Sequence, residues 1–471
     1  MFTSLIHYFF PDLNKDEITK FSYLSVAFFL IIGSYWLVRL LKTTLFYHIA
    51  FPEALGWLPK QGQQFQPIAK AFSPIVVLVL VMIYSKLIDL VKKHVLFYII
   101  CTFYAIVFSG ITTALILRES YGDAYLGKPM LAALGWGSYF LTESFGSLVV
   151  ALFWSFTNSI CTSESAKSGY PMILACAQFG AIAGSVVMIF SGQIGLWKLY
   201  GLAALFVIGV MVVISRLMKA VPASQMIGNK QAAATEKKEE GFFEGLFAGV
   251  RLIATRPYIF GILIVSTLYE AISQVIEYQM HVQANTFPEY SGELGFAKFL
   301  GYYGTATNIL SFLMALLGTS YLIKRYGLRF GLLFYPVALC LSFSLLFAFY
   351  TFGAPSAGQL LAAIFVVMMI AKGLGYAVNN PVKEMMYIPT SKDAKFKAKG
   401  IVDMLGGRTA KATGAGISSK LNVAGNQAAS MQNLFFFGSL IGLGIIGIWI
   451  VAALYVGNKN QKLVKNGEII G

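Results

Sequence analysis

Charged residues are scarce in this chain. Asp, Glu, Lys and Arg make up 12% of its 471 residues, whereas a soluble globular domain carries roughly 25%. Such a deficit excludes a protein whose whole surface faces water. Because 57% of the residues are apolar and the mean hydropathy is +0.69, we expect hydrocarbon to surround much of the chain.

Cysteine is also rare. The four cysteines lie far apart, and no CxxC pair or cysteine–histidine cluster occurs. This usage excludes a disulfide framework and a structural zinc site. The sequence therefore predicts no metal site and no cofactor.

Long apolar runs are abundant instead. A helix needs about 20 apolar residues to cross a bilayer, and runs of that kind recur along nearly the whole chain. They predict an all-α membrane protein with about twelve transmembrane helices. The expected spans lie at 22–46, 67–91, 95–117, 131–160, 171–192, 197–218, 257–282, 298–322, 327–350, 358–380, 400–424 and 433–457.

The longest polar stretch, residues 219–245, divides these spans into two sets of six. Two six-helix halves joined by a central loop are typical of a major-facilitator-like transporter. We therefore predict an amino-terminal half over 1–218, a cytoplasmic loop over 219–245 and a carboxyl-terminal half over 246–471.

Lysine and arginine are distributed unevenly between the two sides of this map. With a cytoplasmic amino terminus, 24 of them lie on the cytoplasmic side and 7 on the opposite side. Cytoplasmic loops of membrane proteins carry such an excess. The count predicts a multi-pass protein of the cell inner membrane with both termini cytoplasmic.

Five cations remain inside the expected spans. Each costs about 2.5–3.5 kcal/mol at a helix centre on insertion scales, and residues of this kind mark transport paths. Acidic residues at the same depth number four, so the cations are in slight excess and favour an organic anion as cargo. The cations are Arg39, Lys42, Lys372, Arg408 and Lys411, and the acids are Glu143, Glu270, Glu277 and Asp403.

Two of these cation pairs share a spacing of three residues. Arg39 with Lys42, and Arg408 with Lys411, each project from one helix face, and one such face from each half could clasp a polyphosphate. Alternatively, Arg39 and Lys42 reach the membrane surface by snorkelling, or the charges form structural ion pairs. If Lys42 binds phosphate, Lys42→Gln should weaken binding and leave stability unchanged.

The segment around Arg408 is not an ATPase motif. Its glycines precede Lys411 at the wrong spacing, and no Ser or Thr follows that lysine directly. We therefore expect a secondary transporter and no enzymatic activity.

Three blocks of sequence resemble the nucleotide transporter family, the ATP/ADP antiporters of plastids and obligate intracellular bacteria. The blocks are Glu143 to Trp154 followed by Asn158, Glu164, Ala166, Lys167 and Tyr170; Lys383-Glu384-Met385-Met386-Tyr387-Ile388-Pro389 followed by Lys397, Lys399, Asp403 and Lys411; and Glu277 ahead of Phe287 to Ser291. The second block matches the family's pattern almost residue for residue.

The resemblance implies substrate-binding roles for Lys42, Glu143, Glu277 and either Lys399 or Lys411. With the cations of the two pairs and the polar residues of the motif blocks, the predicted substrate-binding set is Arg39, Lys42, Glu143, Asn158, Glu277, Lys399, Asp403, Arg408 and Lys411, and the predicted gate or coupling set is Glu164, Lys167, Lys383 and Glu384. The first-span motif keeps two cations but lacks the family's two aspartates, and Ala410 stands where the family has glycine. Glu270 and Lys372 match no motif, so we expect them to form a structural pair.

The resemblance also implies a function, namely exchange of ATP and ADP by alternating access. Its alternatives are a proton-coupled importer of nucleoside triphosphates, an NAD exchanger of the same family, and a membrane receptor that binds nucleotide without transporting it. In the proton-coupled case Glu143, Glu277 or Asp403 would carry the proton. The expected partners are the nucleotide and the lipid bilayer, with no nucleic acid, and the expected state is a monomer.

Overall fold

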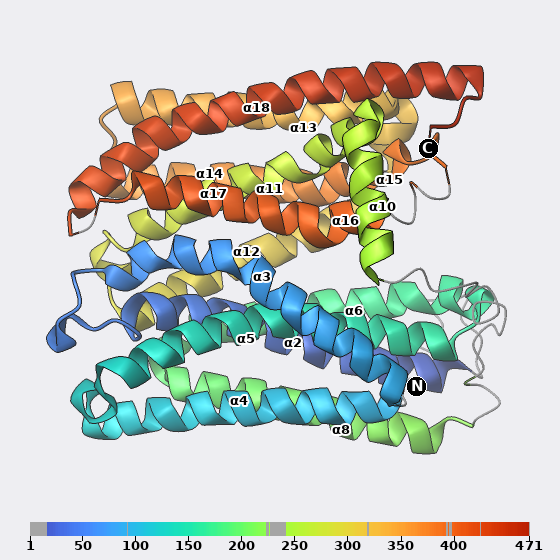
Figure 1. Cartoon of the computed structure of the whole chain (residues 1–471). Helices are drawn as coiled ribbons and strands as arrows, with labels where there is room; N and C mark the ends of the chain where they lie inside the picture. The colour runs from blue at the N-terminus through green and yellow to red at the C-terminus, as the bar shows by residue number, and fades with distance from the viewer. Residues whose placement is uncertain are drawn as a thin grey trace. The chain divides into compact units, whose positions relative to one another are not determined.

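The structure is a computed structural model of the chain (Figure 1). It describes residues 17–91, 93–222, 242–317, 320–391, 398–423 and 425–470, together with Met226 and Ala394. The predicted cytoplasmic loop over 219–245 lies largely outside the described residues, and so does Lys397 of the second motif block.

Helices account for nearly all regular structure in the described part of the chain. The first set comprises α2 (Ile18–His48), α3 (Gln61–Leu90), α4 (Lys93–Tyr121), α5 (Asp123–Ile160), α6 (Ser163–Ile189), α7 (Ser191–Ile194) and α8 (Leu196–Ala220). The second set comprises α10 (Phe242–Thr255), α11 (Pro257–Ala284), α12 (Glu293–Leu317), α13 (Ser320–Phe352), α14 (Ala357–Leu374), the π-helix η5 (Gly375–Asn379), α15 (Asn380–Met386), α16 (Lys399–Ile401), the π-helix η7 (Val402–Gly406), α17 (Gly407–Leu421) and α18 (Gln427–Asn466).

The prediction of an all-α membrane protein is confirmed. Within the described residues, 10 helices are long and apolar enough to cross a bilayer. The expected spans at 298–322 and 400–424 correspond to α12 and to the continuous run from α16 through η7 to α17. Neither is among these 10 helices, and the second is divided into α16, η7 and α17, of which α17 has 15 residues.

The chain forms two compact units. Unit 1 comprises residues 1–57, 75–237 and 292–308, and unit 2 comprises residues 58–74, 238–291 and 309–471. Each unit thus contains a half-helix from the other part of the sequence. The first part of α3 groups with unit 2, and the first part of α12 groups with unit 1.

Helix α2 is the centre of unit 1, where it packs against α5, α6 and α8. Its closest neighbour is α6, because glycines let the two backbones touch. A Cβ on Gly184 would lie 2.2 Å from the Gly33 carbonyl oxygen, and one on Gly180 would lie 2.4 Å from that of Phe29. Small residues four apart are a common means of close helix packing in membranes.

Helix α11 has the same place in unit 2, where it packs against α14, α17 and α18 (Figure 1). A Cβ on Gly414 of α17 would lie 2.3 Å from the carbonyl oxygen of Ala271 on α11. In both α2 and α11, 67% of the most apolar window is buried. Charges on these two helices therefore lie inside their units.

Candidate functional site

A buried ion pair lies inside unit 1. The Lys42 ammonium of α2 contacts the Glu143 carboxylate of α5, and only 3% of Lys42 is exposed. Its Nζ also lies 4.2 Å from the centre of the Tyr139 ring. Tyr139 precedes Glu143 by one helical turn, so a single face of α5 supplies both the carboxylate and the aromatic ring that hold the cation.

Arg39 lies one turn before Lys42 on α2. Its guanidinium stacks over the Trp36 ring, 4.7 Å from the ring centre, and the side chain is half-buried. Stacking on an indole leaves the edge of a guanidinium able to donate hydrogen bonds. Thus the predicted binding residues Arg39, Lys42 and Glu143 lie in one region of unit 1.

Asn158 lies apart from this region. It follows Glu143 on α5 by fifteen positions, which corresponds to roughly 22 Å of helix. Its exposed side chain accepts a hydrogen bond from the Tyr170 hydroxyl of α6, and the Tyr170 ring packs edge-on against Trp154 at 5.1 Å. The structure therefore places Asn158 at the α5–α6 connection.

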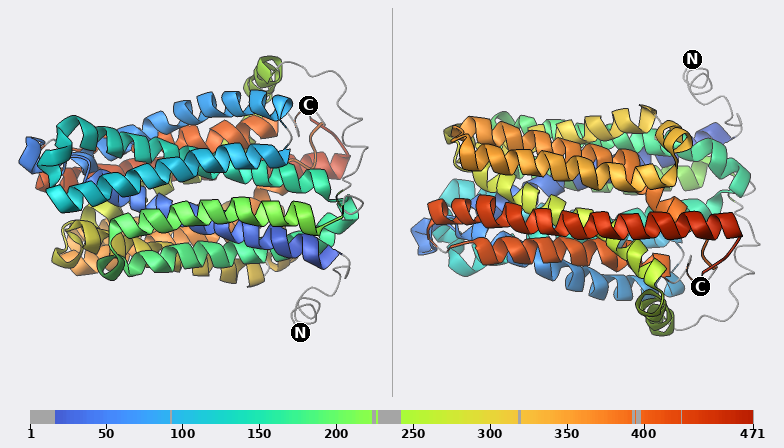
Figure 2. Two further views of the ribbon diagram at one scale, coloured as in Figure 1. Left: turned by 90° about the horizontal axis from the view of Figure 1, so that it is seen from below. Right: turned by 90° about the horizontal axis from the view of Figure 1, so that it is seen from above.

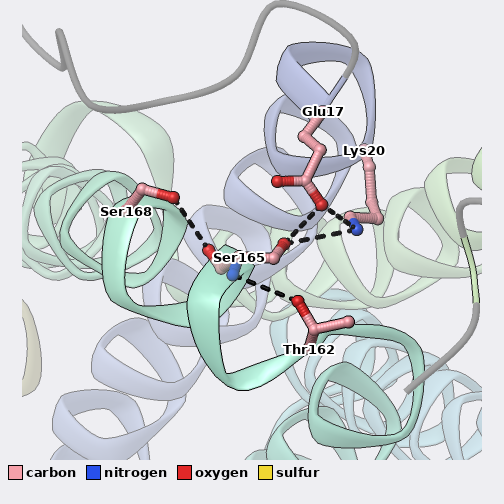
Figure 3. Close-up of polar contacts among 5 residues, drawn as sticks. All are labelled: Glu17, Lys20, Thr162, Ser165 and Ser168. Carbon is pink, nitrogen blue, oxygen red and sulfur yellow. Dashed lines mark hydrogen bonds and ion pairs between the residues drawn. The ribbon is translucent and has the colours of Figure 1, made fainter. Parts of the chain in front are cut away.

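Glu164 and Lys167 lie in the first turns of α6 with exposed side chains. Ser165, between them, is the anchor of this turn (Figure 3). Its hydroxyl donates to the Glu17 carboxylate at the start of α2, and its backbone N–H donates to the Thr162 hydroxyl at 3.2 Å. The predicted gate residues are thereby fixed to the amino-terminal end of α2.

Lys20 also contributes to the contacts between α2 and the start of α6. Lys20 is only 2% exposed, and its Nζ lies 2.7 Å from the Glu17 carboxylate (Figure 3). Burial opposes ionisation of Glu17, but the hydrogen bonds from Lys20 and Ser165 and the nearby ammonium charge outweigh it, so the pKa of Glu17 is lowered. Sequence reasoning missed both residues, because a charge near a helix start is commonly exposed.

Unit 2 contains a corresponding ion pair on its own central helix. The Lys411 Nζ of α17 lies 3.2 Å from the Glu270 carboxylate of α11, and the Tyr269 hydroxyl donates to the same carboxylate at 2.9 Å. Lys372 of α14 is close enough to interact electrostatically with Glu270. Glu270 thus interacts with two of the cations that the sequence placed inside the spans.

From the sequence, Glu270 and Lys372 were expected to form a structural pair apart from the site. The structure instead gives Glu270 a direct contact with Lys411, a predicted substrate-binding residue. The difference arises from packing, because Gly414 brings α17 against the backbone of α11 next to Glu270. Glu270 therefore belongs to the candidate site.

The other predicted residues of α11 and α17 lie near this pair along their helices. Glu277 follows Glu270 by two turns and Arg408 precedes Lys411 by one turn, and both side chains are half-buried. Residues seven or three positions apart share a helix face. Hence one face of α11 carries two acids, and one face of α17 carries two cations.

Two further ion pairs connect α15 with the α16–η7 segment. Lys383 contacts Asp403 at 2.5 Å, and Glu384 contacts Lys399 at 2.6 Å. Each pair joins a predicted gate residue to a predicted substrate-binding residue. We call these two contacts the α15 pairs.

The backbone around the α15 pairs departs from the α-helix. The π-helix η5 directly precedes α15, and the π-helix η7 contains Asp403. Single-turn π segments are rare and frequently occur at functional sites. Nearby, burial and the carboxylates of Asp403 and Glu384 raise the pKa of the Tyr387 hydroxyl, so this tyrosine stays protonated and can donate a hydrogen bond.

Within the residues that the structure describes, no three His, Cys, Asp or Glu side chains come together in a way that could hold a metal ion. The charged side chains of the site offer ion pairs and charge-assisted hydrogen bonds. Cations held by carboxylates in a low-dielectric interior suit the binding of an anion with several charges.

Comparison with known proteins agrees with this chemistry. Residues 134–460 match the family model described as TLC ATP/ADP transporter. The chain is 26% identical over 432 residues to the chloroplastic ADP,ATP carrier protein 2 of Arabidopsis thaliana, covering 82% of this chain and 67% of that one. It is 24% identical to ADP,ATP carrier protein 1 of Chlamydia pneumoniae, covering 94% of this chain and 92% of that one.

Solved structures show the fold. The nucleoside transporter NupG, in a mutant form, superposes with a TM-score of 0.64 at 15% identity, covering 93% of this chain and 99% of that one. A bacterial homologue of the iron transporter ferroportin superposes with a TM-score of 0.60 at 11% identity, covering 94% and 98%. These likenesses confirm the predicted major-facilitator-like arrangement of helices.

Proposed function

Since the chain belongs to the TLC ATP/ADP transporter family, we propose that it exchanges ATP and ADP across a membrane by alternating access. Its relatives in Arabidopsis and Chlamydia are named ADP,ATP carriers, and its helices are those of a multi-pass membrane protein. The proposed activity is transport, with no chemical conversion of the nucleotide.

The observation that carries this proposal is the pairing of membrane-embedded cations with carboxylates in each unit. Lys42 is held by Glu143, and Lys411 by Glu270. A phosphate group can take the place of either carboxylate as the partner of the lysine. In our proposal Arg39, Lys42, Arg408 and Lys411 bind the phosphates, and Glu143, Glu270 and Glu277 hold these cations when nucleotide is absent.

Obligatory exchange follows from the same pairing. A buried charge that loses its partner costs several kcal/mol. A carrier without nucleotide would therefore remain in the state in which its ion pairs are closed. A bound nucleotide replaces the carboxylates and removes that penalty, so reorientation occurs in the loaded state.

The α15 pairs and the start of α6 are the proposed gates. Lys383, Glu384, Lys399 and Asp403 form exchangeable contacts on partly exposed side chains, which suits a contact that opens and closes. Glu164, Lys167 and Asn158 would act at the α5–α6 connection.

The excess of lysine and arginine on one side of the spans supports an inner-membrane location with both termini in the cytoplasm. We further propose a monomer that uses no nucleic acid and no cofactor.

Counterflow into proteoliposomes tests the function. Vesicles preloaded with ADP should take up labelled ATP, whereas empty vesicles and vesicles preloaded with citrate should remain near the level of protein-free vesicles. Uptake into empty vesicles that a protonophore abolishes would instead establish proton-coupled import. A faster exchange of NAD than of ATP would establish the NAD exchanger, and saturable binding without uptake would establish a receptor.

A further inference from the structure

Helix α10 has two unlike faces. On one face Ile253 is buried and packs with Ile259, Ala398 and Val402. On the other face Phe247 is 69% exposed and Val250 is 47% exposed. Arg251 and Ala254 are exposed as well, and the spacing of these four residues places them along one stripe of the helix. We call Phe247, Val250, Arg251 and Ala254 the outer stripe.

The position of α10 relates this stripe to the membrane. Helix α11, a membrane span, begins at Pro257, and only Arg256 separates it from the end of α10. In Figure 1 α10 runs across α11, and both views in Figure 2 show it nearly end-on while the spans of unit 2 lie along the page. Helix α10 therefore lies crosswise to α11, at the end where this span begins.

The first turn of α11 follows the outer stripe along the chain. Phe260, in the first turn of α11, is 49% exposed, as expected for the lipid-facing side of a span. A helix across the membrane surface, with aromatic and aliphatic residues beside arginine, is typical of an interfacial helix. The cations fit this location, because Arg251 and Arg256 are both exposed and cytoplasmic leaflets carry anionic lipids.

We infer that α10 is an interfacial helix that binds anionic phospholipid of the leaflet around the start of α11. Phe247 and Val250 enter the boundary between headgroups and acyl chains, and Arg251 contacts a lipid phosphate. The buried face of α10 connects the lipid contact with the candidate site. Ala398 and Val402, which pack with Ile253 of α10, are the sequence neighbours of Lys399 and Asp403 in the α15 pairs. Bound lipid would thereby stabilise the segment that bears half of the proposed gate.

A nitroxide label tests the location of the stripe without any transport measurement. The full chain, with its four cysteines replaced by alanine, receives Phe247→Cys or, as an aqueous control, Glu468→Cys in the exposed carboxyl-terminal tail. In vesicles of phosphatidylcholine and phosphatidylglycerol, the label at position 247 should collide with oxygen far more than with a water-soluble nickel chelate. The label at position 468 should show the opposite preference.

Two results would overturn the inference. Equal nickel accessibility at both positions would place the stripe in water. A label at position 247 that neither reagent reaches would mean that protein covers the stripe, either another segment of this chain or a second copy.

The role of the anionic headgroup rests on the proposed function and has its own test. Phosphatidylglycerol should stimulate ATP/ADP counterflow by the natural chain several-fold over phosphatidylcholine alone. Arg251→Gln should lose most of that stimulation, and Lys420→Gln, which removes an exposed cation from the last turn of α17, should keep it. Equal stimulation in both variants would overturn the assignment of Arg251. Absence of counterflow in every vesicle would contradict the proposed function while leaving the nitroxide result intact.

Discussion

The central ion pairs of the two units have opposite polarity. In unit 1 the central helix α2 supplies the cation, Lys42, and α5 supplies the carboxylate, Glu143. In unit 2 the central helix α11 supplies the carboxylate, Glu270, and α17 supplies the cation, Lys411. Both pairs thus join the most buried helix of a unit to a neighbour, but the group fixed on the central helix differs.

Burial of the cation separates the two pairs further. The side chain of Lys42 is 4% exposed and that of Lys411 is 39% exposed. The side chains of Glu143 and Glu270 are similar to each other, with 16% and 15% exposed. Removing one partner of a buried ion pair strongly destabilises a protein, whereas an exposed ion pair contributes little to its stability. Lys42 should therefore matter for folding and binding, and Lys411 mainly for binding.

The largest effect is expected from Lys42→Met. Removing the ammonium takes the Lys42 contact away from the buried Glu143 carboxylate, which costs about 3–5 kcal/mol, and also removes the proposed phosphate contact. We expect a marked fall in thermal stability and loss of counterflow. The sequence alone predicted unchanged stability for loss of this charge, and the pair with Glu143 reverses that part of the expectation.

A double variant separates the two losses. Lys42→Met combined with Glu143→Gln removes both charges, so thermal stability should return toward that of the natural chain while counterflow stays absent. Counterflow restored in the double variant would show that Lys42 acts only as a structural partner of Glu143. Thermal unfolding and counterflow on the same preparations decide between these results.

A smaller and purely functional effect is expected from Lys411→Gln. The partly exposed lysine should leave stability within about 1 kcal/mol, because Lys372 also interacts with Glu270. Loss of one charge-assisted phosphate contact, worth about 1.5–3 kcal/mol, should weaken nucleotide binding by roughly 10- to 150-fold. Titration calorimetry with ATP measures this change in binding affinity. A destabilisation as large as that of Lys42→Met would remove the proposed distinction between the units.

The sequence predicted the positions of the helices far better than the contacts between them. Apolar runs located the spans because each helix must satisfy its own backbone in lipid, which makes hydropathy a local signal. The partners of Lys42 and Lys411 depend instead on which helices touch. Close approach of α17 to α11 depends on Gly414, and a glycine in an apolar run gives no indication of the helix that it meets.

The same reasoning explains the other differences between expectation and structure. The charge pattern placed both Glu143 and Glu270 inside the spans, but only Glu143 lies in a family motif, so Glu270 was set aside. Helix α10 was not expected, because its fourteen residues are too few to span a bilayer and its amphipathic pattern adjoins the polar loop.

Gly414→Ala should have an intermediate effect, through geometry and without any change of charge. Its Cβ would lie 2.3 Å from the Ala271 carbonyl oxygen, so α17 must move away from α11 and Lys411 away from Glu270. We expect nucleotide affinity to fall about tenfold, which corresponds to about 1.4 kcal/mol. Gly416→Ala is the matched control, because nothing lies within 4 Å of its Cβ position. Equal affinity in the two variants would mean that Lys411 does not depend on this helix contact.

The smallest effect is expected at the edge of unit 1, where Glu17 pairs with Lys20 and Ser165 (Figure 3). The pKa of Glu17 is lowered from its ordinary value of 4.5. Folding therefore gains stability from this carboxylate above the pKa of the unfolded chain, and loses it as the pH falls through the lower pKa of the folded state. Glu17→Gln should reduce stability by at most about 1 kcal/mol at neutral pH.

That difference should disappear on acidification. Once the pH lies below the folded-state pKa of Glu17, the natural chain also carries a neutral side chain at this position, so its melting temperature and that of Glu17→Gln should converge. Glu468→Gln removes the same charge from the exposed carboxyl-terminal tail and should follow the natural chain throughout. Melting curves recorded from neutral pH to well below the ordinary value of 4.5, so that the lowered folded-state pKa is passed, test this. A gap between the natural chain and Glu17→Gln that stays constant over that range would show that hydrogen-bond geometry, rather than charge, fixes the start of α6 to α2.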